Sequence, residues 1–292
     1  VDLEVKNGIA FITLNRPEAM NALNETVVAQ LERRFTQSEA DPGVRAIVFQ
    51  GAGKDFVAVA VIRYFFDKIK AGRIPEIVAF TRKGHELFLR IEESKKLTIA
   101  LLDGLSLGGG SELALACQVI VATPAGSMAF PETGIGIFPG LGGMLRMARQ
   151  VGPALAKYFT FTGAFISATD ALALGIVTKL VEPAGVDAVI ETLAAGAAPD
   201  KYALREIPEK FKPFAALFDA AHVAGLLAGN APAGANAELA GKVLKTLGYK
   251  APLALRIADE IIDRQAGLTM REAIEVELGR LQEIFSTADA LE

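Results

Sequence analysis

A glycine-rich stretch, residues 103–117, constrains the fold of this chain more than any other part of its sequence. It follows an apolar run, residues 97–102, which predicts a buried strand. Three consecutive glycines, residues 108–110, then open an apolar pattern with helical spacing. A strand, a glycine turn and a helix start leave backbone N–H groups at the positive end of a helix dipole, where negative charge is stabilised. Because Glu112 lies just inside this helix, the stretch indicates either an anion-stabilising catalytic turn or an ordinary tight turn.

Several classes of function are disfavoured by the composition and by motifs that the chain lacks. The glycine stretch has neither the G-x-G-x-x-G spacing nor the Lys and Ser/Thr of a phosphate loop, so we expect neither NAD nor ATP. The formal net charge of −4 gives no electrostatic basis for nucleic-acid binding. No apolar run has the length of a membrane span, and the 51% of hydrophobic residues are typical of a globular chain with a sizeable core.

The cysteine and histidine residues indicate the expected cellular compartment and limit the possible catalytic chemistry. The single cysteine, Cys117, cannot form an internal disulfide and is expected to be a small core residue. Residues 1–5 show no signal-peptide pattern, so we expect a cytoplasmic location. Neither histidine, His85 or His222, has a partner at metal-ligand spacing, which argues against a zinc site and a Ser-His-Asp triad. General acid–base chemistry would then fall on carboxylates.

Strand and helix patterns alternate up to residue 181, and only helical patterns follow Pro183. This order predicts an α/β core with an α-helical C-terminal region. The expected strands are 3–14 as a hairpin, 45–50, 97–102, 119–122 and 176–181. The expected helices of the core are 24–38 with Asn24 as its cap, one ending at Lys70, 75–94, one over the glycine stretch, 144–152, 154–162, and 167–174 with Ser167 as its cap. Those of the C-terminal region are 185–196, 208–229, 236–247, 251–265 and 270–285.

Five groups of residues occur in order along residues 14–177. They are 14–17 with Asn21 and Ala22, 51–58, 107–114, 130–136 with 139–143, and 161–163 with Ala168 and 171–177. In this order they resemble the motifs of the crotonase, or enoyl-CoA hydratase/isomerase, superfamily. The resemblance implies a spiral of ββα turns in residues 1–185 that binds acyl-CoA and performs catalysis. It also implies that the helices of residues 186–292 cover the active site and build a trimer or a dimer of trimers.

The resemblance to the hydratase branch also implies a mechanism, in which water adds to a 2-enoyl-CoA thioester or is removed from a 3-hydroxyacyl-CoA. The thioester oxygen would lie between the backbone N–H groups of Gly109 and Ala60, which stabilise an enolate-like oxygen. Glu112 and Glu132, which have the twenty-residue spacing of that branch, would exchange protons with the water and the α-carbon. CoA would arrive as part of the substrate, with no metal or redox cofactor.

The second motif also carries the expected contacts to the CoA moiety. By resemblance, the backbone of Ala58 and Ile62 would contact the adenine. Lys54 and Arg63 flank the motif and are candidates for the CoA phosphates, with solvated surface charge as the equally weighted alternative.

The same motif departs from the family pattern, which has Gly and Asp where this chain has Val59 and Val61. Valine resists the backbone conformations and the close substrate approach that glycine permits, and it cannot cap the following helix as aspartate does. We therefore expect weak or absent hydratase activity, restored in part by Val59→Gly and Val61→Asp.

Two further departures leave alternatives open. About forty extra residues, near 198–245, are comparable to an insert in the 3-hydroxyacyl-CoA thioester hydrolase branch, but that branch lacks a glutamate at the position of Glu112. The sequence has no initiator Met and stops before the family's last basic helix, which fits an excised or an engineered domain.

Apolar residues of the extra segment suggest a function of another class. Eight of them fall close together: Phe211, Phe214, Ala215, Leu217, Phe218, Val223, Leu226 and Leu227. Phe65, Phe66 and Ile69 make a second group. Each group forms either part of an ordinary helical core or an exposed contact surface. In the second case the chain would be a redesigned crotonase-fold scaffold, self-assembling into a larger particle with little activity.

Overall fold

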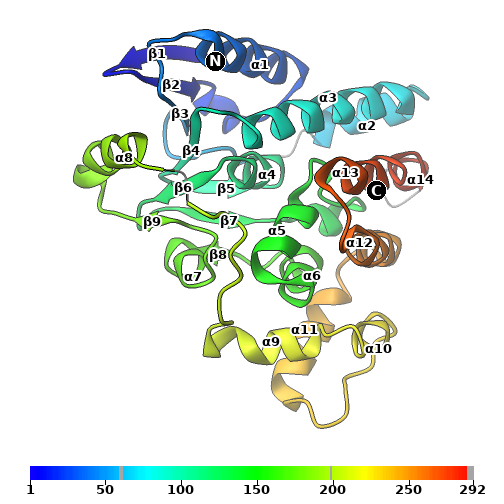
Figure 1. Ribbon diagram of the computed structural model, residues 1–292. Coiled ribbons are helices and arrows are strands. Elements are labelled where there is room, and N and C mark those ends of the chain that lie inside the picture. Colours follow the sequence, from blue (N-terminus) through cyan, green and yellow to red (C-terminus); the bar gives the residue numbers. More distant parts are fainter. Residues whose placement is uncertain (59–61, 198, 288–292) are drawn as a thin grey trace.

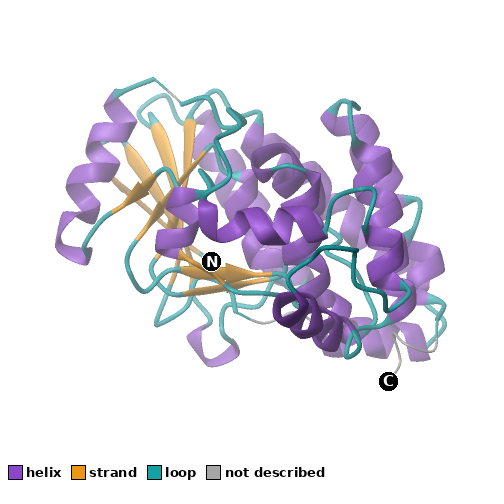
Figure 2. Ribbon diagram, turned by 90° about the horizontal axis from the view of Figure 1, so that it is seen from below, coloured by secondary structure: helices purple, strands orange, loops and turns teal. Residues whose placement is uncertain are grey.

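The computed structural model describes residues 1–58, 62–197 and 199–287, which form an α/β core with a helical C-terminal region. The strands and helix α8, Val186–Ala195, lie on one side of the molecule, and the later C-terminal helices lie on the other (Figures 1 and 2). The larger sheet has the strand order β1-β2-β3-β4-β6-β9, and a small sheet has the order β5-β7-β8. The α/β class and the helical C-terminal region expected from the sequence are confirmed.

The larger sheet begins with an antiparallel hairpin and continues in parallel. Leu3 pairs with Ile12 across the hairpin, and Ile9 then pairs with Ala46 in the next strand. The hairpin turns at Asn7 and Gly8, both with positive φ, as two-residue hairpin turns require. The strands are β1 Asp2–Lys6, β2 Ile9–Leu14, β3 Ala46–Gly51, β4 Leu97–Leu102, β5 Leu105–Leu107, β6 Val119–Ala122, β7 Ser127–Ala129, β8 Ile166–Ser167 and β9 Lys179–Leu180.

The helices of the core follow the predicted positions closely. Both predicted caps are present, since Asn24 Oδ1 accepts from the N–H of Val27 at 2.9 Å and Ser167 Oγ accepts from that of Asp170 at 3.1 Å. The helices are α1 Glu25–Ala40, α2 Ile62–Lys70, α3 Ile74–Glu92, α4 Gly109–Ala116, α5 Gly143–Val151, α6 Pro153–Thr162 and α7 Ala168–Ala173. Cys117 ends α4 and is buried, as expected of a core residue.

Several details of the core differ from the prediction, and the strands β7 and β8 were not expected. The glycine stretch does not run directly from β4 into a helix, because residues 105–107 form β5 and pair with β7. The expected strand at 176–181 is paired with β6 only over Lys179–Leu180. Strand β5 has only three residues, and the paired part of the expected strand 176–181 has only two. The apolar runs therefore do not indicate where strand pairing begins.

Three of the five predicted helices of the C-terminal region are confirmed to within one residue at each end and two are broken, which gives the observed helices. They are α8 Val186–Ala195, α9 Lys212–Leu217, α10 Val223–Leu227, α11 Ala237–Leu247, α12 Pro252–Gln265, α13 Met270–Leu278 and α14 Leu281–Phe285. The predicted helix 208–229 breaks at Asp219, whose carboxylate accepts from the N–H of Ala221 at 3.0 Å and so competes with helical bonding. The predicted helix 270–285 breaks after Leu278, at Gly279, where helix propensity is low.

The apolar residues of the extra segment pack inside the chain. Phe211, Leu217, Phe218, Val223 and Leu226 are each at most 4% exposed. Phe214, Ala215 and Leu227 are partly buried against the same clusters, and Tyr158 stacks on Phe214 with ring centroids 4.3 Å apart. The expectation of an exposed contact surface here is therefore wrong, because α6 and α12 supply the apolar partners within the chain.

The second apolar group is also partly buried within the chain. Phe65 packs against both main core clusters, and its ring centroid lies 5.2 Å from that of Phe285 in α14. Ile69 packs against the C-terminal cluster. Within the described part of the chain, no helix combines the length and the apolar character needed to cross a membrane.

Candidate active site

One enclosed, largely apolar cavity contains the glycine stretch and both candidate glutamates. The cavity has a volume of about 70 Å³, which is enough for several water molecules. Its polar groups include Glu112 and Glu132, and Gly109 forms part of its wall. The apolar lining residues are Leu23, Val57, Phe65, Phe80, Ile137, Phe138, Leu141, Leu281, Ile284 and Phe285. The cavity therefore joins two carboxylates to a surface suited to a hydrocarbon chain.

The first turn of α4 places a backbone donor at this cavity. Gly108 precedes the helix with φ of +52°, and a Cβ atom there would lie 2.5 Å from Oε1 of Glu132, so only glycine fits. The N–H of Gly108 is used, donating to the carbonyl of Ala129 at 3.0 Å. Gly109 is the first helical residue, a position whose N–H has no partner within the helix. Its N–H meets no acceptor among the described residues, so it is available to an oxyanion.

The second motif runs beside this turn up to the point where description ends. Val57 pairs with Ser106 in parallel, and the carbonyl of Val57 accepts from the N–H of Leu107 at 2.7 Å. Ala58 is buried, and its N–H donates to the carbonyl of Met20 at 2.9 Å. Val59, Ala60 and Val61 lie outside the described residues. Ala60 as the second oxyanion donor stays a prediction, as does the effect of the two valines.

Asn21, from the first motif, fixes the approach to the second. Its side chain is 1% exposed, and its Nδ2 donates to the carbonyls of Ala52 and Asp55, both at 2.9 Å. Its Oδ1 accepts from the N–H of Arg16 at 2.8 Å. One buried amide therefore ties together two loops that lie more than thirty residues apart, and it sets the path of the chain toward Val57.

Glu112 is buried and held by backbone donors. It is 2% exposed, and its Oε1 accepts from the N–H groups of Leu141 at 2.7 Å and Gly143 at 2.9 Å. Burial, together with the nearby Glu132 and Glu277, raises the pKa of Glu112 well above its usual value, while the two N–H donors act in the opposite direction. The site therefore holds Glu112 in one orientation toward the cavity.

Glu132 is equally buried but has fewer polar partners. It opens a short 3₁₀ helix, Glu132–Ile135, and is 4% exposed. Its Oε2 has no hydrogen-bond partner among the described residues. Burial raises the pKa of Glu132 to about 8. Because two neighbouring carboxylates in a dry site cannot both ionise cheaply, we expect the pair to keep at least one proton at neutral pH.

The predicted contacts to CoA are less closely gathered. Lys54 is exposed and Ala58 is buried, and neither lines the cavity. Ile62 begins α2 and Arg63 follows it, while the side chains of both lie outside the described ones. These four residues remain predictions for the CoA site.

A family model described as enoyl-CoA hydratase/isomerase matches residues 9–292 of this chain. The chain belongs to the enoyl-CoA hydratase/isomerase family. The crotonase resemblance and its hydratase branch are thereby confirmed. A short-chain-enoyl-CoA hydratase of Clostridium acetobutylicum is 39% identical over 184 residues, which cover 63% of this chain and 69% of that protein.

Other family members match the chain over nearly its whole length. A probable enoyl-CoA hydratase of Rhizobium meliloti is 28% identical over 290 residues, or 99% of this chain and 91% of that protein. The crystal structure of a carnitinyl-CoA dehydratase from Mycobacterium thermoresistibile is 27% identical, with a TM-score of 0.83 over 99% of this chain and 87% of that one. Because both matches cover nearly the whole chain, the extra segment, residues 198–245, is compatible with membership of the family.

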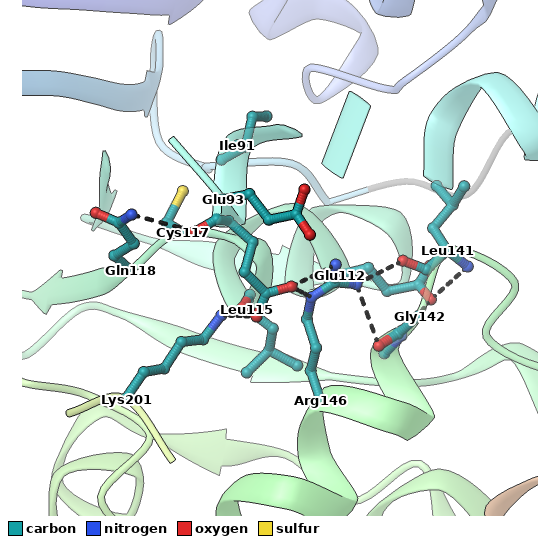
Figure 3. Close-up of polar contacts among 12 residues, drawn as sticks. Ile91, Glu93, Glu112, Leu115, Cys117, Gln118, Leu141, Gly142, Arg146 and Lys201 are labelled. Atoms are coloured by element: carbon teal, nitrogen blue, oxygen red, sulfur yellow. Dashed lines mark hydrogen bonds and ion pairs between the residues drawn. The ribbon is translucent and has the colours of Figure 1, made fainter. Parts of the chain in front are cut away.

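The sequence motifs did not indicate the buried charged residues near Glu112. Arg146 in α5 is fully buried, and its Nη1 donates to the carbonyls of Leu141 and Gly142 at 3.2 and 3.4 Å (Figure 3). Glu92 forms two ion pairs. Its Oε2 lies 2.8 Å from Nη2 of Arg146, and its Oε1 lies 2.8 Å from Nζ of Lys201. The missed signal was the position of charged residues on otherwise apolar helix faces.

Proposed function

We propose that this protein catalyses the hydration of 2-enoyl-CoA thioesters, and the reverse dehydration, at a rate reduced by Val59 and Val61. The observation that carries this proposal is the meeting of Glu112, Glu132 and the Gly109 N–H at one apolar cavity. Addition of water across a conjugated double bond needs a base for the water, an acid for the α-carbon and a donor for the enolate oxygen. The family membership and the names of the relatives support the same reaction.

In the proposed mechanism Glu112 is the base that takes a proton from water. Support comes from its two backbone donors, Leu141 and Gly143, which oppose the rise in its pKa that burial and the neighbouring carboxylates cause. With both hydrogen bonds on Oε1, the other carboxylate oxygen remains to accept the proton.

Glu132 is the proposed acid that delivers a proton to the α-carbon. With a pKa of about 8 it is mostly protonated at neutral pH, as an acid must be. Glu132 also passes close to Gly108, beside the first turn of α4. The Gly109 N–H, together with that of Ala60, would stabilise the oxygen of the enolate-like intermediate.

The remaining contacts follow from the substrate class. The apolar wall would hold the acyl chain, with the CoA moiety outside the cavity near Lys54, Ala58, Ile62 and Arg63. The reaction needs no metal or redox cofactor. We also propose a homo-oligomer, a trimer or dimer of trimers, and a cytoplasmic location.

A spectrophotometric assay of crotonyl-CoA hydration tests the proposal. The unmodified protein should hydrate crotonyl-CoA, and Glu132→Gln should lower kcat by about 10²–10⁴-fold because it removes the proton donor. Glu93→Gln, which changes an exposed glutamate paired with Arg271, is the control and should leave kcat unchanged. Activity that survives Glu132→Gln would contradict the mechanism, and release of free CoA instead of hydration would favour a thioester hydrolase.

A further inference from the structure

Glu277 is a fully buried carboxylate that the proposed mechanism does not use. It lies near the end of α13 on the face that also buries Ala273, Ile274 and Leu278. A carboxylate on an apolar helix face is costly unless it is paired or hydrogen-bonded. The contacts that Glu277 makes therefore indicate what it does for the protein.

Groups from three other elements converge on this carboxylate. Its Oε1 accepts from the N–H of Gly142 at 2.9 Å, and Nε2 of the buried His85 in α3 lies 3.0 Å from the same oxygen. Its Oε2 accepts from Nε2 of Gln265 at 3.4 Å, and Gln265 is itself anchored to the carbonyl of Ala273 at 2.9 Å. Glu277 is thus fixed by α3, by α12 and by the turn before α5, with α13 packed against α3 (Figure 1).

Gly142 is the central residue of the turn that holds Glu112. The N–H groups on either side of it, from Leu141 and Gly143, donate to Glu112, while the N–H of Gly142 donates to Glu277. Gly142 has φ of +87°, in the region that favours glycine. Three successive amides therefore serve two carboxylates, and the orientation of one amide constrains its neighbours.

We propose that Glu277 is a positioning residue: by accepting from Gly142 it holds the turn, residues 141–143, in the conformation that aims Glu112 at the substrate. The inference rests on the proposed function for its catalytic consequence. Removal of the acceptor leaves a buried N–H without a partner, and the turn must move to satisfy it. A displacement of about 1 Å in such a support typically costs about 10²-fold in rate.

Three variants separate this role from general stability. Glu277→Leu removes the acceptor, whereas Glu277→Gln keeps a carbonyl oxygen for Gly142 and removes only the charge. The matched control is Glu275→Leu, because Glu275 lies on the same helix but is exposed and paired with Arg82. Circular dichroism and urea unfolding of each variant establish that the chain is folded.

The kinetic outcome expected is a separation of kcat from KM. Glu277→Leu should lower kcat for crotonyl-CoA by about 10²-fold with KM changed by about twofold or less, because Leu141 is the one residue of the turn 141–143 that lines the cavity. Glu277→Gln should restore kcat to within about fivefold of the unmodified protein, and Glu275→Leu should not change it. Unchanged kcat in Glu277→Leu, or equal loss in Glu277→Gln, would overturn the role.

Hydrogen exchange tests the same role without any substrate. In Glu277→Leu, peptides that contain residues 140–143 should exchange their amide hydrogens faster than in the unmodified protein and in Glu275→Leu. Peptides from α1 should exchange at the same rate in all three. If the unmodified protein hydrates no enoyl-CoA, the proposed function fails, and this measurement still decides the positioning role, which unchanged exchange at residues 140–143 would overturn.

Discussion

The buried glutamates of this protein differ in what surrounds each carboxylate. Burial acts to raise the pKa of Glu92, but the charges of Arg146 and Lys201 outweigh it, so the pKa of Glu92 is lowered. Glu132 has no such cationic partner among the described residues, and burial raises its pKa to about 8. The first environment keeps a carboxylate ionised as part of the scaffold, and the second keeps a proton in the cavity. This contrast is the residue-scale argument for Glu132 as the acid.

The raised pKa of Glu132 predicts how stability depends on pH. Its folded pKa of about 8 exceeds the ordinary value of 4.5, so the contribution of Glu132 is fully present below about pH 4.5 and is lost as pH rises toward 8. Glu132→Gln removes this titration. The variant should therefore gain stability over the unmodified protein with rising pH, reaching on the order of a few kcal/mol at pH 8. Urea unfolding at pH 5, 6.5 and 8 measures the difference, and a gain independent of pH would contradict the assignment.

Val59 carries the second prediction at this scale. Glycine at this position would allow close approach of the thioester, which a β-branched side chain resists. Val59→Gly, alone and with Val61→Asp, should raise kcat/KM for crotonyl-CoA by about tenfold or more, in line with one to two kcal/mol of relieved crowding. Val5→Gly, on an exposed strand position, is the control. No gain in either Val59 variant would refute the idea that these valines impair the site.

At the scale of elements, most of the core could be predicted because the relevant signals are local. Asn24 and Ser167 cap the helices that their positions indicated, and the turn at Asn7 joins the predicted hairpin. What failed had two kinds of cause, pairing with a distant strand and a local side-chain hydrogen bond. Strand β5 exists because β7 lies beside it, and the break at Asp219 depends on a side chain that bonds its own turn. Neither partner is visible in a pattern of apolar residues.

The two glutamates of the candidate site could be predicted from the sequence, but the residues that support them could not. Glu112 and Glu132 were found through motifs, whereas His85 and Glu277 were not, although both lie on otherwise apolar helix faces. His85 shares its face with Phe88 and Leu89, and Glu277 shares its own with Ala273 and Ile274. Such positions identify a buried polar group, but the partner comes from a distant part of the chain. Only the packing of α13 on α3 brings the two together.

Helix α14 carries the prediction at the element scale. Phe285 lines the cavity and packs against Phe65, so its ring limits the space for an acyl chain. Phe285→Ala should raise kcat/KM for 2-octenoyl-CoA relative to crotonyl-CoA by about tenfold, since each methylene in an apolar pocket is worth about 1–3 kcal/mol. It should also lower the free energy of unfolding by about 3–5 kcal/mol. Phe165→Ala, at a residue 63% exposed, is the control. An unchanged ratio would remove α14 from chain-length selection.

For the molecule as a whole, the C-terminal helices belong to the site as much as to the fold. The N–H of Ala251, just before α12, donates to the carbonyl of Thr133 at 3.0 Å, next to Glu132. Glu277 of α13 holds the turn of Glu112, and Leu281 of α14 lines the cavity. One helical region therefore supports the loops next to both candidate glutamates. The sequence divides into residues 1–185 and 186–292 by its strand and helix patterns, but residues of both parts line the cavity.

The central claim is that Glu112 and Glu132 act as one acid–base unit, and a double-mutant cycle tests it most directly. Crotonyl-CoA hydration is measured for the unmodified protein, Glu112→Gln, Glu132→Gln and the double variant. Groups that work as a unit have non-additive effects, so each single change should lower kcat by about 10²–10⁴-fold and the double variant should be about as slow as the slower single one. A double variant whose loss equals the product of the two single losses, or single variants with unchanged kcat, would contradict the account.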